Sequence, residues 1–71
     1  MRFGELKAGD MMASSKTSEF FTVLEVGSAT WGGTEGVRLT VLTGRGEMQK
    51  LSLWAREPMG VHWKLMARKE G

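Results

Sequence analysis

The chain of 71 residues contains no cysteine, no tyrosine, no isoleucine and no asparagine, and it has a single histidine. Without cysteine it can form neither a disulfide nor a thiolate metal site, which fits a reducing compartment. The single histidine, His62, has no second histidine or cysteine with which to bind zinc. No run reaches the roughly 20 apolar residues of a membrane span, and the N-terminus lacks the apolar core of a secretory signal. We therefore expect a cytoplasmic protein without metal, cofactor or membrane contact.

The sequence also lacks the residue patterns that support catalysis. No serine lies in a G-x-S-x-G elbow, and the glycine-rich residues 32–36 lack the lysine and hydroxyl residue of a phosphate-binding loop. A chain this short buries only about 60% of the surface that it exposes when unfolded. It can hardly build the cleft in which convergent polar groups would act. We predict a non-enzymatic protein with one domain over residues 1–71, of which residues 68–71 form a frayed tail.

The charge is small but unevenly distributed. The net charge is +2, yet residues 1–36 carry three basic and five acidic residues, whereas residues 37–71 carry seven basic and three acidic ones. A basic half permits an anionic partner such as nucleic acid. It does not require one, because phosphate binders usually concentrate more charge.

Alternating apolar residues separated by glycine-bearing turns predict an all-β fold. We expect five strands, at about residues 10–14, 19–27, 36–43, 47–55 and 61–67. The connection G-R-G at 44–46 joins the third and fourth of these as a hairpin. The segment GSATWGGTEG at 27–36 is expected to be a long loop, and EPMG at 57–60 is typical of a tight turn. Five strands in so short a chain bury one apolar face each only by curling into a barrel or a tight two-layer sandwich.

This order of strands and loops resembles the small SH3-like barrels, which include the KOW, Tudor and Sm-type modules. LKAGDMM at 6–12 is similar to the L-K-x-G-D segment at the start of such barrels, and FTVLEVG at 21–27 to their long bent second strand. The hairpin at 44–46 matches their distal hairpin, and REPMG at 56–60 lies where these folds have one 3₁₀ turn before the last strand. The resemblance implies a single five-stranded barrel that binds RNA, DNA or protein without catalysis, and it does not choose among these ligands.

The predicted hairpin assigns each side chain to a face. With residues 44–46 in the loop, cross-strand pairs run from Leu42–Met48 to Gly36–Trp54. The core face is then Val37, Leu39, Val41, Leu51 and Leu53. The opposite face places Trp54 against Gly36, at the base of the segment that carries Trp31, so the two tryptophans are expected to be neighbours.

The last strand alternates in the same way. Trp63 is predicted to point inward with Val61 and Leu65, and to be the main aromatic residue of the core. His62, Lys64 and Met66 are predicted to point outward.

Nine residues are candidates for binding a partner: Trp31, Arg38, Leu42, Arg45, Met48, Lys50, Trp54, His62 and Lys64. Trp31 either seals one end of the barrel, which is the interpretation we favour, or forms a contact surface with Trp54. Four of the nine form an outward basic set, which is either an ordinary solvated face or, together with Trp54, a surface on which single-stranded nucleic acid stacks. These four are Arg38, Lys50, His62 and Lys64. Arg45 lies at the tip of the hairpin, where a polar residue often serves only solubility.

Leu42 and Met48 are an expected apolar pair on the outward face. They are either ordinary scattered surface residues or, with Leu24, Val26 or Met66 nearby, a patch for a partner or for a second copy of the chain.

The favoured function is protein–protein interaction. The chain would be a small adaptor or modulator that docks through residues 27–36, Trp54 and the outward face of the hairpin. Accessory proteins of phages and mobile elements are often of this size. The alternatives are RNA or DNA binding through the basic and aromatic residues, and a structural role as a homo-oligomer.

Replacing Trp63 tests the predicted alternation of the last strand. Truncating a core tryptophan to alanine costs roughly 3–5 kcal/mol, so Trp63→Ala is expected to unfold much of the protein at room temperature, as measured by urea denaturation. Trp54→Ala, on the outward face, is the matched control and should keep most of the stability. A native melting temperature for Trp63→Ala would show that the alternation is wrong.

Overall fold

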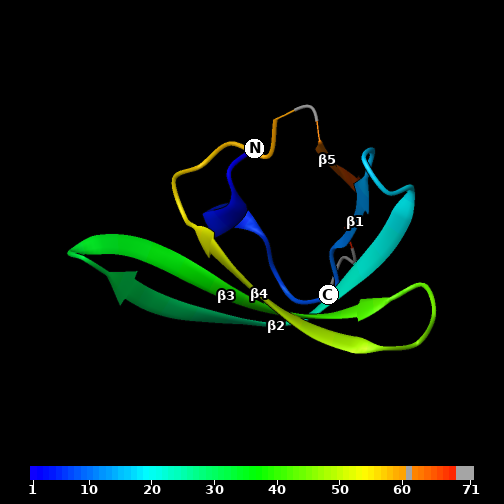
Figure 1. Ribbon diagram of the computed structural model, residues 1–71, viewed down its shortest axis with the longest axis horizontal. Coiled ribbons are helices and arrows are strands. Elements are labelled where there is room, and N and C mark those ends of the chain that lie inside the picture. Colours follow the sequence, from blue (N-terminus) through cyan, green and yellow to red (C-terminus); the bar gives the residue numbers. More distant parts are fainter. Residues whose placement is uncertain (61, 69–71) are drawn as a thin grey trace.

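The computed structural model describes residues 1–60 and 62–68, which form an antiparallel sheet of five strands and one 3₁₀ turn (Figure 1). The elements are η1 (Phe3–Glu5), β1 (Met11–Ser14), β2 (Glu19–Trp31), β3 (Thr34–Thr43), β4 (Met48–Trp54) and β5 (Trp63–Ala67). The order across the sheet is β4-β3-β2-β1-β5. The prediction of an all-β fold with five strands is confirmed. The sheet curls but does not close, because β4 and β5 are its two edges. The described residues contain no helix with the length and apolar character needed to cross a membrane.

The segment at 27–36 is not a loop. β2 continues to Trp31, β3 begins at Thr34, and only Gly32 and Gly33 form the turn between them. Both glycines have positive φ, 58° and 78°, as a type I′ hairpin turn requires. Figure 1 shows this hairpin projecting beyond the other strands. The prediction of a long loop is wrong because glycine, serine and alanine have weak strand propensity, and here cross-strand pairing outweighs that propensity.

A β-bulge bends β2. The pairing with β3 skips Leu24, so that Val23 lies opposite Val41 and Glu25 opposite Thr40. The extra residue increases the local bend and twist. As a result β2 pairs with β1 through its first residues and with β3 along most of its length, which agrees with the expected long bent second strand.

The β3–β4 hairpin has the predicted register throughout, from Leu42↔Met48 to Gly36↔Trp54. Its inner face forms much of the core. Val37, Leu39 and Val41 are buried there, and Leu51 and Leu53 are half-buried. The buried core also contains Phe3, Leu6, Met12, Phe21, Val23 and Met59.

Trp63 points inward as predicted, but it is not the most buried aromatic residue. Phe3 and Phe21 are buried, whereas Trp63 is half-buried and contacts both, with ring centroids 6.4 Å and 5.4 Å away. The reason is its place on β5, an edge strand that has a neighbouring strand on one side only. His62, Lys64 and Met66 are exposed, as expected, and Val61 lies outside the described residues.

The single 3₁₀ turn is not where it was predicted. It lies at Phe3–Glu5. The tight turn predicted at 57–60 is also displaced, because the Glu57 N–H donates to the Trp54 C=O at 3.2 Å and closes a turn over residues 54–57. Pro58 instead pairs with the N-terminus through an isolated bridge to Arg2. The Gly4 N–H donates to the Ala55 C=O at 2.9 Å. A Cβ at position 4 would lie 2.9 Å from that same oxygen, so this close approach favours glycine. The N-terminal segment thereby covers the end of β4.

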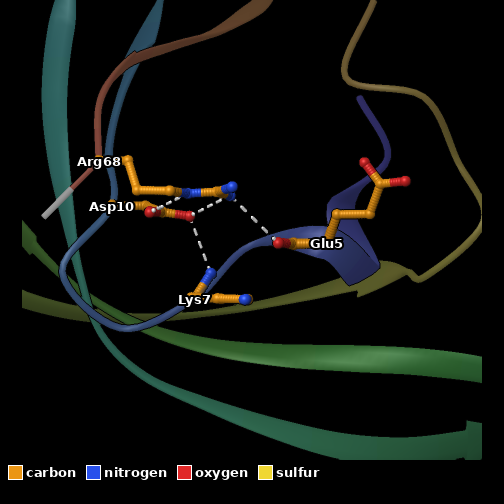
Figure 2. Close-up of polar contacts among 4 residues, drawn as sticks. All are labelled: Glu5, Lys7, Asp10 and Arg68. Carbon is orange, nitrogen blue, oxygen red and sulfur yellow. Dashed lines mark hydrogen bonds and ion pairs between the residues drawn. The ribbon is translucent and has the colours of Figure 1, made fainter. Parts of the chain in front are cut away.

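An ion pair between the exposed Arg68 side chain and the buried Asp10 carboxylate joins the end of β5 to the N-terminal segment (Figure 2). Asp10 is 1% exposed, and its carboxylate accepts hydrogen bonds from Arg68 Nε at 2.9 Å and Nη2 at 3.0 Å. It also accepts the Lys7 N–H at 2.8 Å, and Arg68 Nη2 donates to the Glu5 C=O at 3.3 Å. Arg68, expected in the frayed tail, is therefore held by a bidentate contact. Residues 69–71 lie outside the described residues.

The same contact makes stability depend on pH. The Arg68 guanidinium, bonded to the Asp10 carboxylate, lowers the pKa of that carboxyl below its ordinary 3.8. The unfolded chain then binds the proton more readily than the folded one, so the contribution is complete above the ordinary pKa and is lost as pH falls through the folded-state pKa.

We expect Asp10→Asn to lower the free energy of unfolding at neutral pH and to flatten its decline in acid. Urea denaturation at several values between about pH 3 and about pH 7 measures both effects. Glu47→Gln, which removes an exposed carboxylate from the β3–β4 turn, is the control. If the free energy of unfolding of Asp10→Asn fell with decreasing pH as steeply as that of the wild type, this role of Asp10 would be contradicted.

Candidate partner-binding face

Seven of the nine candidate residues lie on one face of the sheet, which we call the outer face. They are Trp31 from β2, Arg38 and Leu42 from β3, Met48, Lys50 and Trp54 from β4, and Lys64 from β5. Residues that pair across neighbouring strands share a face, so the register places all seven opposite the core. Arg45 lies apart, exposed in the β3–β4 turn, and His62 lies just before β5.

Trp31 and Trp54 are in contact, as predicted. Their ring centroids are 5.5 Å apart at an interplanar angle of 84°, an edge-to-face arrangement that aromatic rings favour. The Arg38 guanidinium carbon lies 5.8 Å from the centre of the Trp31 ring, within the range of a cation–π interaction. We call these three residues the tryptophan cluster.

Trp31 does not seal the end of a barrel. It is half-buried on the outer face, where its ring lies over Gly36, and a Cβ on Gly36 would overlap that ring. The favoured interpretation fails because β2 runs as a strand to residue 31, and strand alternation then directs this side chain away from the core. Trp54 remains 45% exposed at the edge of the sheet.

A second apolar group crosses the outer face near the other end of β4. Met48 pairs with Leu42, Leu42 with Thr22, and Thr22 with Met11, so that four strands contribute to one row. Met48 is 68% exposed, and Phe20 on the same face is 51% exposed. We call Met11, Thr22, Leu42 and Met48 the apolar row.

The apolar row differs in part from the patch expected around Leu42 and Met48. Leu24 and Met66 are exposed, whereas Val26 faces inward and packs against the core, because the bulge at Leu24 shifts the alternation. Met11 and Phe20 were not recognised as candidates. The adjacent phenylalanines 20 and 21 could have revealed one of them, since alternation forces one of two neighbours outward.

Basic side chains lie between the two apolar groups. Arg38 and Lys50 border a shallow depression that also involves Glu25, Gly27, Leu39 and Thr40. No ion pair within residues 1–60 and 62–68 engages Arg38, Lys50 or Lys64, so their charges are available to a partner. The outer face therefore combines exposed aromatic and aliphatic side chains with unpaired positive charge.

In the part of the chain that the structure describes, no three histidine, aspartate or glutamate side chains lie close enough to hold a metal ion. Comparison of the chain with protein-family models, with curated proteins and with solved structures finds no match.

Adding a methyl group at position 36 tests the tryptophan cluster. In Gly36→Ala the new Cβ would displace the Trp31 ring and separate it from Trp54, with an expected loss of roughly 0.5–1.5 kcal/mol in unfolding free energy. Near-ultraviolet circular dichroism should lose the signal of the coupled tryptophans. Gly27→Ala is the control, because its Cβ would meet only the Arg38 C=O at 3.9 Å. Equal spectra for Gly36→Ala and Gly27→Ala would contradict the packing described here.

Proposed function

We propose that this chain is a non-enzymatic binding module, an incompletely closed relative of the SH3-like barrels, which docks on a partner protein through its outer face. The observation that carries the proposal is the tryptophan cluster, in which two edge-to-face indole rings and an arginine lie on the exposed side of the sheet. Tryptophan and arginine are the residue types enriched at the energetic centres of protein interfaces.

The rest of the outer face supports the same function. Single exposed apolar side chains are normal on a soluble protein, but contiguous groups mark interaction sites. Here Trp54, Met48 and Phe20 are each at least 45% exposed on one face of a chain of only 71 residues. Arg38 and Lys50 lie beside these groups, where charges guide association and select a partner more than they add affinity.

Binding of single-stranded RNA or DNA is the second candidate function. It is favoured by the position of Arg38 and Lys50 beside Trp54, because stacking on aromatic rings combined with charge along the backbone is how such strands are bound without sequence preference. The two functions differ in their response to salt. Binding through several phosphate contacts weakens steeply as salt rises, whereas a tryptophan-centred protein interface weakens little.

Replacing Trp54 tests the docking face. Trp54→Ala should abolish capture of the partner protein from nuclease-treated lysate. It should lower the unfolding free energy only by about the roughly 0.5–1.5 kcal/mol of its contact with Trp31, and the protein should stay folded, because nearly half of this side chain is already exposed. Arg45→Ala, in the exposed β3–β4 turn, is the matched control and should retain capture. If Trp54→Ala still captured the partner, docking through this residue would be contradicted. If nuclease treatment of the lysate abolished capture by the wild type, the partner would be held by nucleic acid, and docking on a protein would be contradicted.

A further inference from the structure

The outer edge of β4 carries backbone hydrogen-bonding groups that the sheet does not use. The Thr43 N–H donates to the Glu47 C=O and the Ala55 N–H donates to the Glu35 C=O, so these two pairs are of the hydrogen-bonded type. Pairs of this type recur at every second residue of an antiparallel ladder. Along β4 they therefore involve Gln49, Leu51 and Leu53, which pair with β3.

It follows that the N–H and C=O groups of Met48, Lys50 and Ser52 point away from β3. β4 is an edge of the sheet, and beyond it the backbone hydrogen bonds of the N-terminal segment go to Ala55, Glu57 and Met59. Among residues 1–60 and 62–68, none of these bonds reaches residues 48–52. The edge from Met48 to Ser52 is thus an extended template on which a further strand could pair.

The core beside this edge is also incompletely covered. Leu51 and Leu53 of β4 point inward but are only half-buried, as is Trp63 of β5. Two hollows lie between the edges, one bordered by Gln49 and Trp63 and the other by Leu53 and Trp63. Apolar side chains from an added strand would fill this space and shield these residues from water.

We propose that β4 binds an extended segment of the partner protein as a sixth strand. Main-chain hydrogen bonds to Met48, Lys50 and Ser52 would supply affinity, and alternate side chains of the segment would supply specificity. This inference rests on the proposed function, because it names the form in which a partner protein is recognised.

The charges beside this edge indicate the composition of that segment. Lys50 lies at the edge on the outer face, with Arg38 on the adjacent strand, and neither is engaged in an ion pair within the described residues. Opposite charges directly across two strands stabilise the pair. The segment should therefore alternate apolar residues, which face Leu51 and Leu53, with acidic residues, which face Lys50.

A second copy of the chain fits this edge less well. Symmetric pairing of β4 with β4 centred on Lys50 would place the two Lys50 side chains opposite each other. Pairing of β4 with the free edge of β5 would bring Lys50 and Lys64 to the same outer face. Like charges across strands are destabilising, and lysine on an edge strand commonly prevents self-association.

Replacing Ser52 tests strand addition directly. Random peptides of about ten residues, the length of a long strand, are selected by display on the immobilised full chain, and their affinities are measured by fluorescence anisotropy. Ser52→Pro removes an N–H that points away from β3, a position at which edge strands tolerate proline. Ser52→Ala, which keeps that N–H, is the matched control.

We expect the selected peptides to alternate apolar and acidic residues and to bind the wild type and Ser52→Ala equally. Ser52→Pro should bind them roughly tenfold more weakly or worse, and Lys50→Glu should also bind them more weakly. The amide protons of Met48, Lys50 and Ser52 should exchange rapidly in the free protein and slowly in the complex. Should Ser52→Pro fail to fold, the same hydrogen bonds can be removed from the peptide. Peptides N-methylated at alternate residues lack the N–H groups that would pair with β4, and they should not bind.

Several results would overturn the proposal. They are equal binding by Ser52→Pro and Ser52→Ala, equal binding of methylated and unmethylated peptides, no enrichment of peptides over a blank surface, or a dimeric mass that Ser52→Pro reduces to the monomer. The two proposals can fail separately. If Trp54→Ala loses the lysate partner while Ser52→Pro retains it, docking through the outer face stands and strand addition is wrong.

Discussion

The hydrogen bond from the Thr43 N–H to the Glu47 C=O begins the β3–β4 ladder, and the rest of the molecule depends on the register that it starts. That register sends Val37, Leu39 and Val41 to the core and Arg38 and Leu42 to the outer face. It also decides which backbone groups of β4 face solvent. A slip of one residue would bury the polar side chains and expose the apolar ones, so core, outer face and open edge are consequences of one alignment.

The N-terminal segment and Arg68 make contacts near the two edges of the sheet, which do not pair with each other. The N-terminal segment, with Phe3 and η1, lies against the end of β4, while Arg68 returns from β5 to the Asp10 carboxylate. These contacts hold the two edges of the sheet to a common segment although the edges do not pair with each other. Such a small domain has little apolar area to bury, and contacts distant in sequence therefore matter more to its stability.

The parts that sequence reasoning predicted are those governed by local rules. Alternation and a glycine-bearing turn were sufficient for the β3–β4 register, and Gly36 opposite Trp54 correctly placed Trp31 beside Trp54. The hairpin at 27–36 was missed because its residues have little preference for a strand until the partner strand is present. The hydrogen bonds between Asp10 and Arg68 join residues 58 positions apart. Alternation along a strand predicts the face on which a side chain lies, but it cannot predict contacts over such a distance in sequence. The bulge at Leu24 likewise shifts the alternation without a sequence signal.

The overlap between Trp31 and any side chain at position 36 makes these two positions a single unit for sequence change. The three atoms nearest to a Cβ at position 36 all belong to the indole ring at 31, so this ring is what makes glycine necessary there. In evolution, a smaller side chain could therefore replace Trp31 first, and a larger one could replace Gly36 afterwards. In the reverse order, the intermediate protein would have a disrupted tryptophan cluster. Among sequences that share this hairpin, glycine at 36 should accompany tryptophan at 31, and the two should vary together.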